Sequence, residues 1–438
     1  MSNENPAAQE RRRRLLEDSR VFCILPWASV NIQPTGKVFP CCVADRHRPV
    51  GLLNDSPLAE IWNSEEFKRL RRNMLEDRES PECVRCYELE RAGFQSIRQE
   101  NNETMRRHWP VVEQTGPDGS VPHLNVAYLD VRFSNVCNFR CRYCCSELST
   151  GWREDELKLY GRNRLPAVLK PTEDPERFWR DLEAILPRVE MIYFSGGEPL
   201  IAPEHYRVLQ ALIANKRAPD VSLLYSTNFS TLSFAKTDVT ELWKGFKKVH
   251  LAASLDGMGP QGEYIRKNQD WGEVLRLRRL MLEKCPEVGF NLAPTLTAMN
   301  ALHLPDFHWD WLERGFIGVD DIYINMLVEP EGYSAQVLPD SLKRQAAEKY
   351  GKHAERVRAK YGPGTGRVAA HFKAAANFMA ARDKSELLPD LRHRIASLDA
   401  VRNERFADVF PEMAAGIFPE SYRKNSSGGS APRRRTSS

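Results

Sequence analysis

The sequence contains no apolar run that approaches the ~20 residues a bilayer-spanning helix requires. It also lacks a signal-peptide pattern, because the basic run Arg11–Arg14 is followed by Leu15 and Leu16 and then directly by acidic residues. We find no internal repeat. We therefore expect no membrane partner and a cytoplasmic protein.

A strong charge of one sign is also missing. Lys and Arg number 63 against 59 Asp and Glu, which leaves a formal net charge of only +4. The basic runs Arg11–Arg14 and Arg433–Arg435 lie near the termini, where solvated tails are more common than nucleic-acid footprints. Hydrophobic residues make up 42% and charged residues 28%, which is typical of a globular protein, and we expect no nucleic-acid partner.

Cysteine, in contrast, is abundant, with ten residues in the chain. Disulfides are rare in the cytosol, where clustered cysteines more often bind metal or take part in chemistry. The cysteines therefore need a functional explanation.

The pattern of elements divides the chain into six parts. Short β-rich runs alternate with helical stretches over residues 123–330, which is typical of βαβ units and a parallel sheet. We predict an α/β fold with a partial (β/α)6 barrel in this region. The predicted parts are a flexible arm (1–20), a small cysteine-rich domain (21–99), a linker (100–122), the barrel (123–330), a helical C-terminal extension (331–423) and a disordered tail (424–438).

The strongest chemical signal is a loop of three cysteines, Cys137, Cys141 and Cys144, directly after a predicted strand. A cubane iron–sulfur cluster has four irons to ligate, so three thiolates leave one iron open for another ligand. A zinc site is the alternative, but zinc prefers four protein ligands in structural sites and gains little from this spacing.

A second signal follows the apolar strand predicted at Glu190–Phe194. Gly196 and Gly197 allow the backbone to approach a ligand closely, and the carboxylate of Glu198 can accept a charge-assisted hydrogen bond from an ammonium group. Alone, such a sequence is often only a turn.

The third signal lies near the N-terminus, where Cys23, Cys41, Cys83 and Cys86 can close around one metal centre. On spacing alone, a four-cysteine zinc ribbon competes with a cluster. Three cysteines remain outside these sets. Cys42 and Cys145 each adjoin a proposed ligand and stay open as alternatives, whereas Cys285 is interpreted as a buried apolar residue.

Taken together, these motifs resemble the radical S-adenosylmethionine (SAM) superfamily. The three-cysteine loop has that family's spacing, including an aromatic, Tyr143, before the last cysteine, and Gly196-Gly197-Glu198-Pro199 is similar to its GGEP motif. The resemblance implies a [4Fe–4S] cluster whose open iron binds SAM, and reductive cleavage of SAM to a 5′-deoxyadenosyl radical that abstracts hydrogen from a substrate.

A further part of the resemblance is to the peptide-modifying branch of that family. Ser254, Asp256 and the downstream Arg266 are similar to residues that contact the ribose and carboxylate of SAM in that branch. With Tyr143 and the Gly-Gly-Glu motif, they are the predicted cofactor-binding residues. No residue is assigned a catalytic role.

The N-terminal segment resembles SPASM/twitch auxiliary-cluster domains in the amino-acid sequence around its cysteines, from Pro34 to Cys42 and at Cys86-Tyr87. The lack of further downstream cysteines favours the one-cluster twitch form with an auxiliary [4Fe–4S] cluster. Such domains usually follow the barrel, whereas this segment precedes it. The resemblance implies a peptide or protein side chain as substrate, and an electron donor such as flavodoxin or ferredoxin.

Two rival functions stay open at this stage. One is radical SAM chemistry on a small metabolite, and the other is a non-catalytic scaffold that binds zinc or an iron–sulfur cluster. A third, an iron–sulfur electron carrier, leaves the Gly-Gly-Glu motif unexplained.

Overall fold

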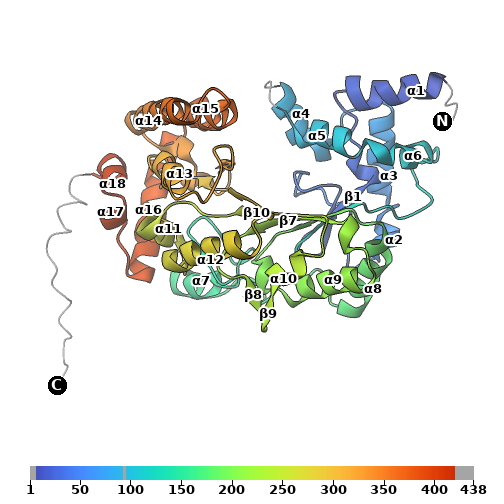
Figure 1. Cartoon of the computed structure of the whole chain (residues 1–438), viewed down its shortest axis with the longest axis horizontal. Helices are drawn as coiled ribbons and strands as arrows, with labels where there is room; N and C mark the ends of the chain where they lie inside the picture. Colours follow the sequence, from blue (N-terminus) through green and yellow to red (C-terminus); the bar gives the residue numbers. More distant parts are fainter. Residues whose placement is uncertain (1–5, 92–94, 420–438) are drawn as a thin grey trace. The chain divides into compact units, whose positions relative to one another are not determined.

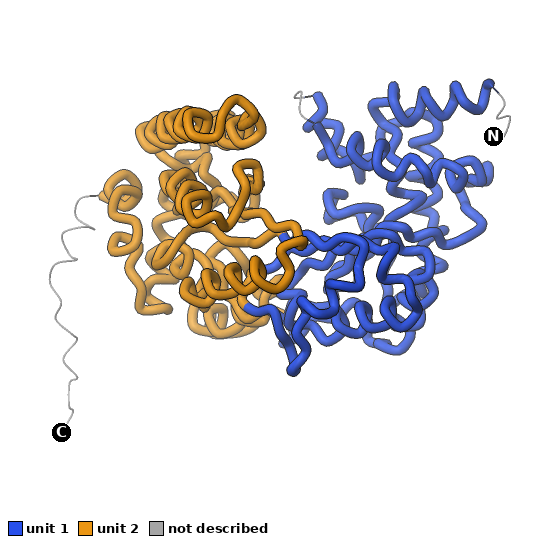
Figure 2. Tube along the Cα trace, viewed as in Figure 1, with its two compact units in different colours: residues 1–137, 166–227, 231–251 blue, residues 138–165, 228–230, 252–438 orange. Residues whose placement is uncertain are grey.

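A computed structural model of the chain describes residues 6–91 and 95–419, which form two compact units (Figures 1 and 2). Unit 1 comprises residues 1–137, 166–227 and 231–251, and unit 2 comprises residues 138–165, 228–230 and 252–438. The chain passes from unit 1 to unit 2 directly after Cys137. The predicted tail at 424–438 lies outside the described residues.

Unit 1 is built on a mostly parallel sheet with the strand order β10-β7-β6-β4-β1-β2-β3. Strand β4 pairs in parallel with β6 and with β1, which comes from the cysteine-rich segment. Hence the cysteine-rich segment and the barrel strands share one sheet. The strands are β1 (Ser29–Ile32), β2 (Lys37–Phe39), β3 (Gly51–Leu52), β4 (Tyr128–Val131), β6 (Met191–Phe194), β7 (Ser222–Thr227), β8 (Ser233–Phe234), β9 (Thr237–Asp238) and β10 (Lys248–Ala253).

Apolar side chains of alternate strand residues form the core of unit 1, because successive side chains of a strand point to opposite faces of the sheet. In β6, for example, Ile192 and Phe194 are fully buried. The Phe194 ring stands 4.7 Å from the ring of His205 on α9, and His205 also lies 2.8 Å from the Tyr225 hydroxyl of β7. Helix α9 therefore packs on this apolar face.

Helices surround the sheet, including in two segments where the sequence predicted none. In the predicted arm, Leu15 and Leu16 are buried, and in the predicted linker Trp109 and Val112 are buried. These buried apolar side chains hold both segments against the rest of unit 1. The structure therefore differs there from the expected flexible arm and linker. The helices are α1 (Pro6–Arg13), α2 (Leu58–Ile61), α3 (Glu65–Leu75), α4 (Val84–Arg91), α5 (Ile97–Thr104), α6 (Trp109–Glu113), α8 (Pro175–Ile185), α9 (Pro203–Ala214) and α10 (Val239–Trp243).

In unit 2, short strands are followed by the helical C-terminal region that the sequence predicted. The Ala253 carbonyl at the end of β10 accepts from Ala293 N, just after β12, and β13 pairs in parallel with β14. The elements are β5 (Arg140–Cys141), β11 (Arg266–Lys267), β12 (Gly289–Leu292), β13 (Thr295–Leu296), β14 (Asn325–Met326), α7 (Trp152–Tyr160), α11 (Gly259–Ile265), α12 (Trp271–Lys284), α13 (Leu304–Glu313), α14 (Asp340–Tyr361), α15 (Gly366–Ala381), α16 (Leu388–Arg402), α17 (Phe406–Val409) and α18 (Pro411–Ile417).

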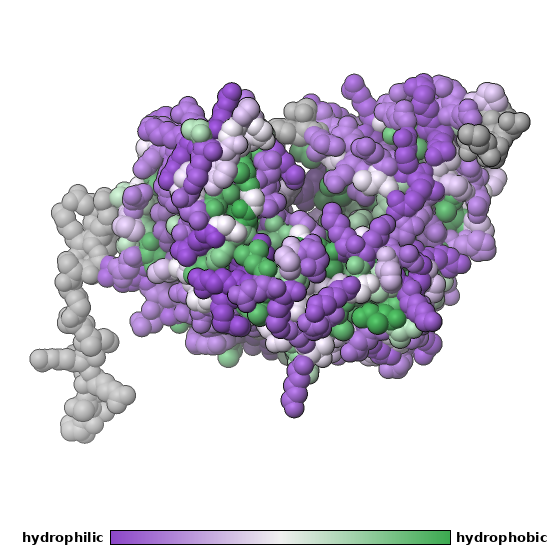
Figure 3. Space-filling model, viewed as in Figure 1, coloured by the Kyte–Doolittle hydropathy of each residue, from purple (hydrophilic) through white to green (hydrophobic). Residues whose placement is uncertain are grey.

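The architecture confirms the α/β class, with a mostly parallel sheet and a helical C-terminal region. The strands of the described residues form no closed barrel. The face of the molecule seen in Figure 3 is mainly hydrophilic, with smaller hydrophobic areas between charged side chains. Within residues 6–91 and 95–419, no helix combines the length and apolar character that crossing a bilayer requires.

A buried ion network joins the C-terminal helix α16 to the three-cysteine loop. The Arg142 side chain is fully buried and donates from Nη2 to Asp399 Oδ1 and to Glu404 Oε2, each at 2.6 Å. Its guanidinium also lies over the Tyr264 ring, 3.5 Å from the centroid. Helix α16 ends because Asn403 adopts the left-handed conformation, which Asn tolerates, and Glu404 follows at once.

We predict that Arg142→Met strongly destabilises the protein, because it leaves Asp399 and Glu404 without their buried cation. Breaking a buried ion pair in this way typically costs about 3–5 kcal/mol of unfolding free energy. Denaturant unfolding followed by circular dichroism measures the loss. The matched control is Lys158→Met, which removes an exposed pair with Glu154 and should cost less than about 1 kcal/mol. Equal losses in the two variants would contradict a structural role for Arg142.

Candidate functional site

Cys141, the middle cysteine of the loop, is held in unit 2 by backbone pairing. It lies in β5, which pairs antiparallel with β11 so that Cys141 faces Arg266. The Cys141 side chain is buried, and Arg266 donates from Nη1 to its sulfur at 3.5 Å. Burial raises the pKa of the Cys141 thiol, and the Arg266 charge offsets part of that effect.

Three of the predicted cofactor-binding residues, Tyr143, Asp256 and Arg266, form one hydrogen-bonded cluster. Arg266 donates from Nη2 to the Tyr143 hydroxyl (2.6 Å) and to Asp256 Oδ1 (3.1 Å), and Tyr143 donates to Asp256 Oδ2 (2.7 Å). Asp256 also accepts from the Thr295 backbone N–H at 2.8 Å. Asp256 is fully buried, and its carboxylate accepts the hydrogen bonds that hold this cluster together.

Charge compensation keeps Arg266 protonated. Burial lowers the pKa of Arg266, but Asp256, Tyr143 and Cys141 together raise it well above its usual range. Burial raises the pKa of Tyr143 well above its usual range, so its hydroxyl stays protonated and can donate. The fourth predicted residue of this region, Ser254, is half-buried and directly follows β10.

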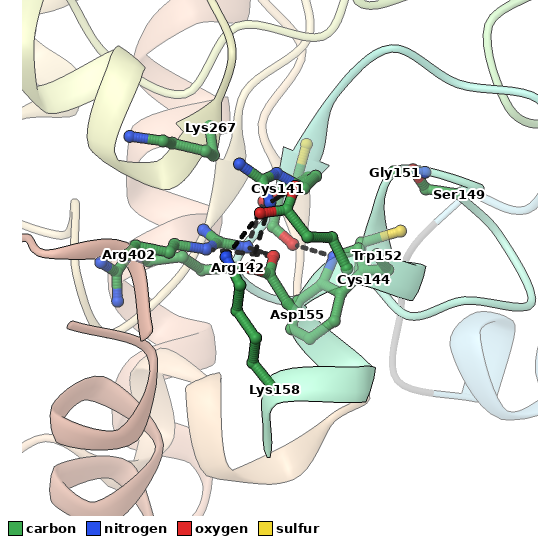
Figure 4. Close-up of polar contacts among 12 residues, drawn as sticks. Cys141, Arg142, Cys144, Ser149, Gly151, Trp152, Asp155, Lys158, Lys267 and Arg402 are labelled. Atoms are coloured by element: carbon green, nitrogen blue, oxygen red, sulfur yellow. Dashed lines mark hydrogen bonds and ion pairs between the residues drawn. The ribbon is translucent and has the colours of Figure 1, made fainter. Parts of the chain in front are cut away.

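The segment after the cysteines is fixed by a second set of contacts, shown in Figure 4. Trp152 donates from its indole nitrogen to the Cys141 carbonyl oxygen at 2.8 Å. Asp155, fully buried, accepts from Arg402 Nη2 at 2.8 Å and pairs with Arg140 Nη1 at 3.2 Å. Helices α7 and α16 therefore hold the loop on both sides of Cys141.

In unit 1, the Gly-Gly-Glu motif lies directly against the residue that precedes Cys137. Gly196 and Gly197 both have positive φ, at 76° and 51°. A Cβ on Gly197 would stand 2.2 Å from the carbonyl oxygen of Val136, so no other residue fits there without a backbone shift. The next residue, Glu198, donates from its backbone N–H to the same Val136 oxygen at 2.8 Å.

The Glu198 carboxylate is almost fully buried, with 1% of the residue exposed. Its Oε1 accepts from the Leu200 backbone N–H at 2.9 Å and from the Thr227 hydroxyl at 2.8 Å. Thr227 ends the neighbouring strand β7. Thr227 is not among the predicted cofactor-binding residues, because a threonine before an asparagine is also typical of a turn.

All four predicted N-terminal ligands, Cys23, Cys41, Cys83 and Cys86, line one small cavity in unit 1. Arg98, which also lines it, donates from Nη1 to the Ser19 and Phe22 carbonyl oxygens at 3.0 and 2.7 Å and thereby fixes the chain before Cys23. Cys42 is not among the lining residues that the structure describes. This geometry favours Cys41 over Cys42.

These four thiols are strongly perturbed by burial. Burial raises the pKa of Cys23 to about 12 and that of Cys86 above its usual range. For Cys41 and Cys83, burial and then neighbouring cysteines raise the pKa well above its usual range. No disulfide joins any of the ten cysteines, all of which lie in the described part of the chain, and Cys145 is exposed. In the described residues, no group of three or more His, Cys, Asp or Glu is arranged to hold a single metal ion.

Sequence reasoning missed the residues that support these clusters. Arg142 and Asp399 are separated by 257 positions, and Arg402 reaches back 247 positions to Asp155. Such pairs leave no pattern in a single sequence. Asn300 is a further example, because its amide donates to the Asp256 carbonyl oxygen at 3.0 Å from 44 positions away.

Two family models match the chain. Residues 23–87 match the SPASM iron–sulfur cluster-binding domain, and residues 131–303 match the radical SAM superfamily. The first range contains the four cysteines of the cavity. The second contains Cys137, Cys141 and Cys144, the Gly-Gly-Glu motif and the Asp256–Arg266 pair.

Curated relatives include GTP 3′,8-cyclases. That of a Sulfurovum species is 26% identical over 179 residues, which cover 41% of this chain and 48% of the relative. That of Rhizobium etli is 27% identical over 185 residues, covering 41% and 47%. The chain thus spans about half the length of the curated relatives it matches.

Solved structures with partial similarity include native anSMEcpe with bound AdoMet and Cp18Cys peptide, at 18% identity, a TM-score of 0.35, and coverage of 54% of this chain and 61% of that one. Streptococcus suis SuiB bound to precursor peptide SuiA matches at 15% identity and a TM-score of 0.32, with coverage of 76% and 63%. From the two family models and the motifs within them, the chain belongs to the radical SAM superfamily of enzymes and carries a SPASM iron–sulfur domain ahead of its radical SAM region.

Proposed function

We propose that Cys137, Cys141 and Cys144 ligate a [4Fe–4S] cluster that binds SAM, and that the protein uses it to start radical chemistry on a substrate. When bound, such a cluster supplies the electron that splits SAM into methionine and a 5′-deoxyadenosyl radical. The observation that carries the proposal is the buried Cys141 sulfur, with the Arg266 guanidinium 3.5 Å away.

The charged groups around Cys141 suit a thiolate that ligates iron. A buried thiolate needs positive charge nearby, because desolvation favours the protonated thiol. Arg266 provides that charge and is itself neutralised by Asp256, whose Oδ2 lies 2.8 Å from Arg266 Nε. We therefore assign Asp256 to positioning Arg266 and Tyr143. Arg266, Tyr143 and Ser254 remain the proposed contacts of SAM in this unit.

In unit 1, Glu198 is proposed to accept a hydrogen bond from the ammonium group of SAM. A carboxylate in this buried position binds a cation more strongly than an exposed one would, because little water screens the charge. Thr227 and the Leu200 N–H both donate to its Oε1 and so fix the orientation of the side chain. Gly196 and Gly197 have positive φ angles, which glycine adopts readily, and they add no side chain of their own at this point.

The second cluster is proposed to be held by Cys23, Cys41, Cys83 and Cys86. Four thiols with raised pKa values surround one cavity, and they lose their protons when cationic iron compensates the thiolate charge. The auxiliary domain is proposed at residues 21–99 and the partial barrel at 123–330. An electron donor such as flavodoxin or ferredoxin is the expected partner.

The proposed substrate is a peptide or a protein side chain, as the SPASM domain suggests. A small metabolite is the second candidate, because curated relatives include GTP 3′,8-cyclases. A short precursor-peptide gene beside this one would favour the peptide. Incubating the reconstituted, reduced protein with GTP and analysing the products by mass spectrometry tests the nucleotide.

The first prediction from this function is that replacing Cys137, Cys141 and Cys144 by Ala abolishes cleavage of SAM, because the only cluster with an open iron is lost. The measurement is 5′-deoxyadenosine released under dithionite by the anaerobically reconstituted protein. Cys285→Ala, which removes a buried thiol of the same unit outside the loop, is the control and should keep full activity. Continued release by the triple variant would refute the site.

The second prediction is that Glu198→Gln weakens SAM binding by roughly ten- to a hundredfold, because a charge-assisted hydrogen bond of about 1.5–3 kcal/mol is lost. Gln retains an oxygen for the Leu200 and Thr227 donors, so the loop should stay in place and the iron content should not change. Isothermal titration with SAM gives the affinity. Glu204→Gln, at the start of α9, is the control. A wild-type affinity for SAM in Glu198→Gln would leave the motif as an ordinary turn.

The third prediction is that a variant with Cys23, Cys41, Cys83 and Cys86 changed to Ala keeps about half of the iron, roughly four of eight atoms per chain. Elemental analysis of iron, sulfide and zinc measures this. Cys42→Ala is the matched control and should keep all the iron, since Cys42 does not line the cavity. If the fourfold variant instead lost zinc and no iron, the site would be a zinc ribbon.

A further inference from the structure

One face of the sheet in unit 1 carries a row of three polar side chains. The register aligns Asn31 of β1 with Asp130 of β4 and with Tyr193 of β6. The residues one position later, Val131 and Phe194 among them, point to the opposite face and are fully buried in the core. These strands lie in the sheet between β1 and β7, which Figure 1 labels.

Asp130 is the unusual member of this row. Only 1% of the residue is exposed, and neither carboxylate oxygen has a hydrogen-bond partner of normal geometry in the described part of the chain. Arg132, on the same face of the strand, has Nη2 3.9 Å from Asp130 Oδ2, and its Nη1 is also buried without a partner. The Asn31 amide nitrogen is the third unpartnered atom of the row.

Burial raises the pKa of Asp130, and Arg132 and Asn31 offset only part of that effect. A buried charge without full hydrogen bonding costs folding free energy, so a group of this kind needs an explanation beyond stability. Natural proteins keep such unfavourable groups mainly where function requires them.

The pair is fixed beside the proposed SAM-binding motif. A Cβ on Gly196 would stand 2.5 Å from Arg132 Cβ and 2.6 Å from its Cγ, so the arginine stem covers this glycine. Asp130 and Arg132 thus lie beside the proposed SAM-binding motif of unit 1.

We propose that Asp130 and Arg132 form a substrate-recognition pair that binds a primary carboxamide group, such as an Asn or Gln side chain. One N–H and the C=O of a carboxamide lie on the same edge, so the Asp130 carboxylate can accept from the N–H while the Arg132 guanidinium, 3.9 Å away, donates to the carbonyl oxygen. A free phosphate or carboxylate would be repelled by Asp130, and an ammonium group by Arg132. The inference rests on the proposed function, because it identifies the amide as part of that enzyme's substrate.

The first test is stability. The double variant Asp130→Leu/Arg132→Met replaces both charged groups by apolar ones and leaves no unpaired buried charge, so the reconstituted full-length protein should unfold at the wild-type temperature or above it. Asp155→Leu is the matched control, because Asp155 is equally buried but paired with Arg140 and Arg402, and it should unfold several degrees lower. If the double variant unfolds as early as Asp155→Leu, the pair is structural and the proposal is overturned.

The second test is binding, measured by saturation-transfer NMR of the reconstituted protein with acetamide at millimolar concentration. Methyl acetate, which keeps the carbonyl group but has no N–H, is the control probe. We expect a signal for the amide at least threefold larger than for the ester, and its loss in Asp130→Leu. Arg132→Met, which keeps the stem over Gly196, should also lose it. Equal signals for both probes, or an amide signal that survives both substitutions, would overturn the proposal.

These outcomes are separate from the fate of the proposed function. A wild-type protein that binds the amide through Asp130 but releases no 5′-deoxyadenosine would refute SAM cleavage and leave the amide site standing. Release of 5′-deoxyadenosine without amide selectivity would refute the amide site alone.

Discussion

The buried guanidinium of Arg142 is the contact on which the candidate site of unit 2 depends. Arg142 stands between Cys141 and Tyr143, so its bonds to Asp399 and Glu404 fix the backbone of the three-cysteine loop. The loop is held from two sides, because Arg142 contacts α16 and Glu404, two residues beyond its end, whereas Cys141 contacts Arg266. The C-terminal extension is therefore a structural part of the site, since removing it would leave this buried arginine unpaired.

In unit 1 the cysteine-rich segment is held by a different interaction, the backbone hydrogen bonding between strands. Strand β1 of the cysteine-rich segment pairs in parallel with β4, the strand that leads toward Cys137. Cys23 precedes β1 and Cys41 follows β2, so the auxiliary cavity is tied to the barrel sheet by consecutive hydrogen bonds. A domain joined only by a flexible linker would not hold such a position. The shared sheet explains how a segment that precedes the barrel in sequence can act as part of the same unit.

The sequence was most informative where chemistry depends on local spacing. The cysteines, Gly196 and Gly197 were identified because ligand spacing and glycine conformation are local properties. The helical extension predicted at 331–423 shows the limit, because helix α16 within it breaks at Asn403, whose left-handed conformation brings Glu404 back to Arg142. Neither that break nor the pairing of β1 with β4 follows from periodicity, because each depends on partners far apart in the chain. The roles proposed for the individual site residues remain predictions.

Two buried carboxylates, Asp256 and Asp130, differ in the hydrogen bonds that they accept within the protein. This difference distinguishes a carboxylate with a structural role from one that is available to recognise a ligand. Asp256 receives bonds from Arg266, Tyr143 and the Thr295 backbone, so its charge is used entirely within the protein. Asp130 is as deeply buried, yet its oxygens meet no donor at normal geometry among the described residues. Burial has the same desolvation cost for both groups, and only the first recovers that cost through internal bonds. An acid that stays unsatisfied beside the Gly-Gly-Glu motif therefore has its hydrogen-bonding capacity available for a ligand.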